Sequence, residues 1–174
     1  MDYHESKIFP GKQVIVWEDD ASRAILAGRE SNNATTQQAI TVVKEAMKKA
    51  QEEYSAFLLE LNTDKGSQFY ANKKDKTGKK ALAKFERFLK KEGINHIPSR
   101  RNHPQTNGKE ERWFRTYEEK RGEFNSFKDF IKWYNNRIHL GLNRKIGITP
   151  NEAIINKLKP ENILGLYTRR LNQK

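Results

Sequence analysis

The apolar runs of this chain are short, and this feature restricts its fold most. The longest are Gln13–Trp17 and Ala56–Leu61, far below the roughly 18 residues that a membrane-spanning helix requires. Both have the length of a buried β-strand. The turn signal Pro10-Gly11 precedes the first run, and the second leads directly into polar sequence. We therefore expect a globular domain built around short strands.

The sequence between and after these runs predicts helices, because apolar residues recur there every three or four positions. The first helix begins at Thr35 or Thr36 and the second ends at Gly93. Thr149-Pro150 supplies an N-cap and a proline at the first position of a last short helix. Further strands are predicted over Arg23–Arg29 and Ile94–Pro98, and further helices over the residues that carry Trp113, Phe114 and Tyr117 and over Ser126–Arg137.

The order of these elements predicts an α/β fold. The early consecutive strands favour an antiparallel meander, and the later alternation of strands and helices favours parallel units in the same sheet. The length of 174 residues is typical of one domain. We assign residues 1–158 to that domain and residues 159–174 to a C-terminal tail, and we expect residues 99–107 to form a polar loop.

Charge narrows the functional classes. The net charge is +12, from 34 Lys and Arg against 22 Asp and Glu, and residues 73–101 carry +8 of it, with a Lys-rich insert around Lys73–Lys80. This concentration indicates a polyanionic partner, most simply nucleic acid, although a solvated helix face would have the same composition. The absence of cysteine excludes disulfides, iron–sulfur clusters and thiol nucleophiles. No secretory signal begins the chain, so we expect a cytoplasmic setting.

Two acids stand where chemistry is expected. Asp64 follows an apolar strand and precedes Gly66, and the carboxyl ends of strands in α/β sheets face the ligand crevice. Glu111 lies near the start of a helix and shares a face with Arg115, four positions on. A turn-capping aspartate and a surface ion pair are the alternative interpretations of these two sites.

The remaining acids are less distinctive on their own. Asp2 stands at the beginning of the chain, and the pair Asp19-Asp20 is a competing source of carboxylates at the end of a strand. The four histidines lack the spacing of a metal site, so zinc hydrolysis is not expected. A metal site here would be made of carboxylates, which hard Mg²⁺ and Mn²⁺ prefer.

Several motifs occur in a fixed order along nearly the whole chain. They are Asp2-Tyr3-His4, Glu18–Arg23, Asn62–Phe69, Arg100–Arg115, Tyr134-Asn135-Asn136-Arg137-Ile138-His139 and Thr149–Ala153, and the most specific stretch is His103-Pro104-Gln105-Thr106-Asn107-Gly108-Lys109-Glu110-Glu111-Arg112. Together they resemble the catalytic core of retroviral-type integrases and insertion-sequence transposases, in particular the bacterial and archaeal branch.

The resemblance implies an RNase H-like fold with a central mixed five-stranded sheet flanked by helices. It also implies an active site of three acids, which map to Asp2, Asp64 and Glu111, with Asp19 in a supporting position. The 46 residues between Asp64 and Glu111 exceed the usual spacing of the family, and the Lys-rich insert accounts for the excess. Only Met1 precedes Asp2, so we expect an upstream DNA-binding domain in the parent protein.

The resemblance further implies residues that hold DNA. Asn107 and Arg115 match positions that approach the DNA ends, and we expect Arg100 and Arg101 to bind backbone phosphates with them.

The implied function is DNA integration or transposition. Such a polynucleotidyl transferase cleaves DNA ends and joins the 3′-OH to target DNA, with two Mg²⁺ or Mn²⁺ ions per site roughly 3.5–4 Å apart. Its partners would be the element ends, the target duplex and further copies of the chain in a homodimer or higher oligomer. Two alternatives stay open: a catalytically impaired DNA-binding or assembly module, and an RNase H-type nuclease.

Overall fold

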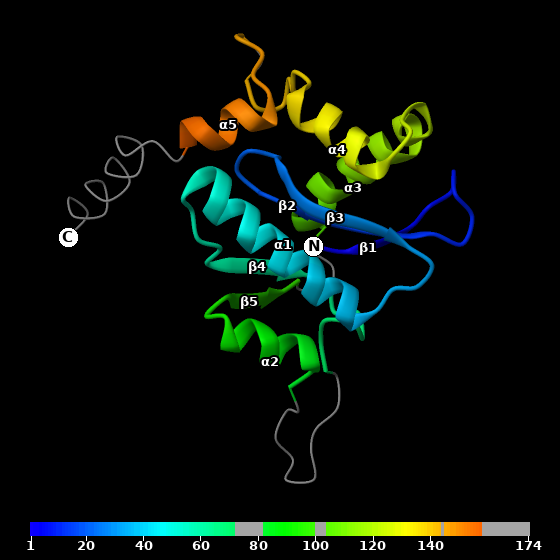
Figure 1. Cartoon of the computed structure of the whole chain (residues 1–174), viewed down its shortest axis with the longest axis vertical. Coiled ribbons are helices and arrows are strands. Elements are labelled where there is room, and N and C mark those ends of the chain that lie inside the picture. Colours follow the sequence, from blue (N-terminus) through cyan, green and yellow to red (C-terminus); the bar gives the residue numbers. More distant parts are fainter. Residues whose placement is uncertain (72–81, 100–103, 144, 158–174) are drawn as a thin grey trace, which may run out of the picture.

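The computed structural model describes residues 1–71, 82–99, 104–143 and 145–157 (Figure 1). The strands are β1 (Tyr3–Glu5), β2 (Gln13–Glu18), β3 (Ile25–Ser31), β4 (Glu60–Thr63) and β5 (Asn95–Pro98). The helices are α1 (Thr36–Tyr54), α2 (Lys84–Lys91), α3 (Pro104–Lys120), α4 (Phe127–Asn136) and α5 (Pro150–Lys157), with a short 3-10 turn at Arg121–Glu123. Within these ranges no helix combines the length and the apolar content needed to cross a membrane.

The strands form two sheets rather than the predicted single one. Strands β1, β2 and β3 make the expected antiparallel meander, and β4 and β5 make the expected parallel pair. Where β1 approaches β4, the amino group of Met1 donates a hydrogen bond to the carbonyl oxygen of Asn62 (2.8 Å). One such bond is too little pairing to form a ladder. The two sheets therefore meet at a seam.

Strand β2 is buried on both faces, which creates three layers. Ile15 and Trp17 pack into a cluster with α1, α2 and β4. Val14 and Val16 point the opposite way, into an aromatic cluster with α3 and α4. Figure 1 shows α1 and the pair α3 and α4 on either side of these strands. The apolar run in β2 is continuous because each face of this strand meets a helix layer.

Local capping residues set the ends of the helices as predicted. The Thr35 side chain accepts a hydrogen bond from the Gln38 amide (3.2 Å) at the start of α1, and Ser55 ends this helix in the left-handed conformation (φ 51°). Gly93 follows α2 with φ of +73°. At α5, the Thr149 hydroxyl accepts from the Glu152 amide (3.1 Å).

Two predicted boundaries differ from the structure, and a third prediction is not tested by it. The apolar run from Ala56 is a strand only from Glu60 onward, and Phe57 and Leu59 are 78% and 72% exposed. Helix α3 begins at Pro104, inside the predicted loop 99–107, because proline is well suited to the first turn of a helix. The Lys-rich insert around Lys73–Lys80 lies outside the described residues.

Helix α4 is fixed to the sheet through one amide side chain. Asn135 Nδ2 donates to the Ile25 carbonyl oxygen (2.9 Å), and the Ile25 amide donates to Asn135 Oδ1 (2.8 Å). Gly28 permits the close approach of this helix, since a Cβ there would lie 2.8 Å from Val16 Cγ1 and 3.1 Å from Phe127 Cε1. The buried Asn135 thus pairs with β3 much as another strand would.

Candidate active site

Two of the predicted acids face each other across the seam between the sheets. Asp2 directly precedes β1 and Asp64 directly follows β4. Burial and the nearby carboxylates of Asp64 and Glu110 together raise the pKa of Asp2 to about 6, and burial has the largest effect. The Tyr3 amide donates to Asp2 Oδ1 (2.7 Å) and partly opposes this shift. Two carboxylates therefore repel that of Asp2 at this seam.

The loop after β4 holds Asp64 in a confined position. Its Oδ1 atom is buried and has no hydrogen-bond partner among the described residues. The carboxylate lies over Gly66, where a Cβ would come within 3.1 Å of both its oxygens. The glycine in the Asp64-Lys65-Gly66 motif thus leaves room for this carboxylate. A buried oxygen without a partner is the kind of atom that a cation satisfies.

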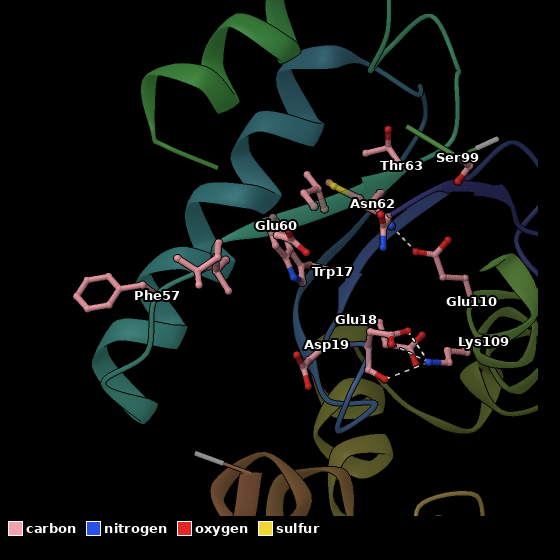
Figure 2. Close-up of a pocket in the computed structure, with 15 residues that line it drawn as sticks. Trp17, Glu18, Asp19, Phe57, Glu60, Asn62, Thr63, Ser99, Lys109 and Glu110 are labelled. Atoms are coloured by element: carbon pink, nitrogen blue, oxygen red, sulfur yellow. Dashed lines mark hydrogen bonds and ion pairs between the residues drawn. The ribbon is translucent and has the colours of Figure 1, made fainter. Parts of the chain in front are cut away.

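The third acid that the structure turns toward Asp2 is Glu110. Its carboxylate pairs with the amino group of Met1 (Figure 2). Trp113 and Phe114 are buried, three and four positions after Glu110. Residues at this spacing share one face of a helix, so Glu110 is oriented inward. Glu111 is exposed. Its assignment as the third acid stays a prediction. Sequence reasoning did not select Glu110, although its helical spacing from Trp113 and Phe114 could have indicated it.

A groove of about 640 Å³ adjoins these acids, between the end of β2, strand β4 and the start of α3 (Figure 2). Glu18 lines it with a side chain that is only 4% exposed. Neither of its carboxylate oxygens has a hydrogen-bond partner among the described residues, and Arg23 Nη1 lies 3.9 Å away. Burial raises the pKa of Glu18 to about 8, against the opposing effect of Arg23. Sequence reasoning gave Glu18 no role.

The neighbouring acids Asp19 and Asp20 have structural partners. Asp19 Oδ2 accepts from both the amide (2.7 Å) and the hydroxyl (2.6 Å) of Ser22 and so closes the turn after β2. Asp20 accepts from Lys109 Nζ (2.7 Å), which connects that turn to α3. Asp19 therefore supports the end of β2, and Asp20 helps to fix the start of the helix that carries Glu110.

Of the four predicted DNA-binding side chains, that of Arg115 lies among the described residues. Arg115 is exposed on α3. Asn107 lies in the first turn of α3, and the structure describes its backbone but not its side chain. Arg100 and Arg101 fall outside the described residues. Their role in holding DNA stays a prediction.

The donor set at the seam suits a hard divalent cation. Asp2 and Asp64 offer oxygen ligands and an excess of negative charge that a cation would relieve. No group of three or more His, Cys, Asp or Glu side chains in the described ranges stands close enough together to enclose a metal ion. The described residues thus bring two carboxylates near each other at the seam, and these two do not by themselves enclose an ion.

Comparisons with known proteins agree on one family. Residues 1–104, which include Asp2 and Asp64, match the integrase core domain family. The structure is similar to the catalytic core domain of BIV integrase, with a TM-score of 0.62 and 19% identity over 90% of this chain and 92% of that one. No curated protein sequence matches the chain.

The structure is also similar to a chain of the simian T-cell lymphotropic virus intasome in complex with the PP2A regulatory subunit B56 gamma. The TM-score is 0.58 at 16% identity, over 87% of this chain and 51% of that one, so the chain spans about half of that relative. These likenesses show the RNase H-like fold of integrase catalytic cores.

Proposed function

This chain belongs to the integrase core domain family, and on that premise we propose that it is a metal-dependent polynucleotidyl transferase. It would cleave DNA ends and join the resulting 3′-OH to target DNA. The observation that supports this proposal most is the meeting of Asp2 and Asp64 across the seam, where burial and the neighbouring carboxylate of Asp64 raise the pKa of Asp2. Crowded carboxylates from distant segments are typical of sites that hold divalent cations.

We assign Mg²⁺ or Mn²⁺ binding to Asp2, Asp64 and one of two adjacent glutamates. Glu111 occupies the position that the sequence motif designates, and Glu110 is the one directed toward Asp2. When bound, a pair of such ions supplies an activated oxygen nucleophile and neutralises charge on the phosphoryl group. The chain itself contributes the oxygen ligands, and the buried Asp64 Oδ1 atom would be satisfied in that arrangement.

The substrate in this proposal is DNA. The net charge of +12 favours a polyanion, and the similar structures are those of an integrase core and an intasome. Intasomes are assemblies on DNA, so we also propose that this chain acts as a dimer or higher oligomer. Backbone phosphates near the DNA ends would be contacted by the predicted DNA-binding residues Arg100, Arg101, Asn107 and Arg115.

The test is strand joining on a branched, pre-cut DNA oligonucleotide with Mn²⁺, a substrate that demands little recognition of the DNA end. Glu110→Gln and Glu111→Gln form a matched pair, because both remove one negative charge from the same helical turn. We expect joining by the unaltered chain and loss of at least 10³-fold in one of the two variants. The variant that loses activity identifies the third ligand.

Other outcomes separate the alternatives. Equal activity in both variants would contradict the three-acid site. Tight DNA binding without any joining would indicate an assembly module, and cleavage of RNA–DNA hybrid in preference to duplex DNA would indicate an RNase H-type nuclease.

A further inference from the structure

The motif Tyr134–His139 has no part in the site described above, yet it leads to a group of cations. Tyr134 and Asn135 are buried, and the hydrogen bonds between Asn135 and Ile25 fix this end of α4 on the sheet. The two residues that follow at alternate positions, Arg137 and His139, lie near Arg23 and Arg112. We call Arg23, Arg112, Arg137 and His139 the arginine cluster.

Contacts from three segments bring the arginine cluster together. A Cβ at Gly141 would lie 3.3 Å from His139 Nδ1 and 3.7 Å from Arg112 Nη1, so these two side chains converge on one point. Arg137 Nη2 lies 3.5 Å from the Thr116 hydroxyl, which itself donates to the Arg112 carbonyl oxygen (3.1 Å). The guanidinium of Arg137 also stacks 5.1 Å from the ring centre of Tyr134, which restricts its rotation.

Several nitrogen atoms of the arginine cluster are buried without a hydrogen-bond partner in the described part of the chain. Buried polar atoms in native proteins are normally satisfied, because an unpaired buried donor or acceptor destabilises the fold. Arg137 Nε and His139 Nδ1 have no hydrogen bond among the described residues, and Arg23 Nη1 has only the long ion pairs with Glu18 and Asp20. A group with several acceptor oxygens would satisfy these nitrogens.

The charge balance gives the sign of that group. The cluster holds three guanidinium groups, and the one buried carboxylate beside it, Glu18, stands 3.9 Å from Arg23. Asp20 lies 3.5 Å from Arg23 but is 75% exposed and already accepts from Lys109. The same three arginines, together with burial, lower the pKa of His139. The positive charge is thus in excess, and an anion would be stabilised.

We propose that the arginine cluster binds a phosphate group of the DNA backbone, at a site separate from the three-acid site. Guanidinium groups match phosphate oxygens with paired N–H donors, and such charge-assisted bonds are among the strongest that proteins make. The cluster adjoins the groove through Glu18 and Arg23. The inference rests on the proposed function for the identity of the anion, since DNA is the substrate assigned there.

The experiment measures binding of a fluorescent DNA duplex by anisotropy, in EDTA, over a range of salt concentrations. EDTA removes any contribution from metal ligands. Loss of one phosphate contact lowers the slope of log affinity against log salt by about 1. We expect this change, and roughly fivefold weaker binding at about 0.1 M salt, in both Arg112→Met and Arg137→Met. Lys128→Met removes one exposed charge from α4 at a distance from the cluster and should leave the slope unchanged.

Two further measurements keep the test decisive. Arg137→Lys retains the charge but not the paired donors, so it should recover part of the affinity even if Arg137→Met unfolds. A wild-type slope in folded Arg112→Met, together with wild-type affinity in folded Arg137→Lys, would overturn the proposal. Strand joining reports separately on the proposed function, because an inactive chain whose slopes still change would contradict that function and leave the phosphate site standing.

Discussion

We call Asp2, Asp64 and Glu110 the seam acids. Glu18 lies near this group through Glu110 and near the arginine cluster through Arg23, but the two groups are built from different parts of the fold. Asp2 and Asp64 come from strand ends, where the sheets bring like charges together. The arginines come from helices and loops, and contacts such as that between Arg137 and Tyr134 hold them. One region therefore has unmet negative charge and the other has unmet positive charge.

This difference shows how a basic chain can contain both a cation site and an anion site a short distance apart. Glu18 lies between opposing influences, because Glu110 raises its pKa and Arg23 lowers it. Strand ends fix the backbone firmly, so the acids have little freedom to separate. Long arginine side chains can adjust to a ligand of varied position. The predictions below test this contrast, beginning with the largest effect.

Removing one seam acid should abolish chemistry without removing DNA binding. Asp64→Asn takes away a charge that contributes to the raised pKa of Asp2, so the Asp2 pKa should fall from about 6 while strand joining drops by at least 10³-fold. Titration followed by NMR and the joining assay measure the two effects. Asp20→Asn, which changes an exposed acid of the adjoining groove, is the control and should keep its activity. An unchanged Asp2 pKa would show that the two carboxylates do not interact.

Cutting the connection between α4 and the sheet should destabilise the side that carries the arginine cluster. Asn135→Ala leaves both the amide and the carbonyl of Ile25 buried and unpaired. We expect a loss of about 3 kcal/mol in the free energy of unfolding, measured by urea denaturation. Asn136→Ala changes the exposed neighbour and should cost less than about 1 kcal/mol. Equal losses in both variants would disprove the anchoring role of Asn135.

Neutralising Glu18 should alter the pH dependence of stability. The pKa of Glu18 in the folded chain, about 8, lies above its ordinary value of 4.5. Its stabilising contribution is therefore complete below pH 4.5 and is lost as the pH rises through 8. Relative to the unaltered chain, Glu18→Gln should gain about 4 kcal/mol in the free energy of unfolding between pH 5 and pH 8.5. Parallel pH profiles for the two proteins would show that Glu18 titrates normally.

Breaking the surface ion pair between Lys109 and Asp20 should have the smallest effect on stability. Lys109 Nζ lies 2.7 Å from Asp20, but Asp20 is 75% exposed and solvent screens the pair. Lys109→Met should therefore cost about 0.5 kcal/mol or less in thermal unfolding. A loss above about 2 kcal/mol would mean that this pair, rather than the packing of Trp113, fixes the start of α3.

Much of the fold follows from local sequence. The β2 run, the caps at Thr35 and Thr149 and the glycine after α2 are confirmed because each depends on neighbouring residues only. The run from Ala56 was extended too far. The exposed side chains of Phe57 and Leu59 show that an apolar sequence becomes a strand only where a partner strand is present.

The candidate site was less predictable, for a physical reason. The sequence indicated Asp2 and Asp64, and the structure brings them together. The arginine cluster unites positions 23, 112, 137 and 139, whose proximity depends on how α3 and α4 pack on the sheet. Similarly, whether a glutamate turns inward depends on the rotation of α3 about its axis, which a motif of consecutive residues does not specify.

The seam between the sheets gives the acids a mechanical role. Asp2 belongs to one sheet and Asp64 to the other, and the described bond between the strand ends is that from Met1 to Asn62. A cation held by both aspartates would cross-link the two sheets at this seam. Ligand binding and the relative rigidity of the two halves would then be coupled in both directions. A more rigid contact between the sheets would raise the affinity for the cation, and the bound cation would in turn slow the separation of the two sheets.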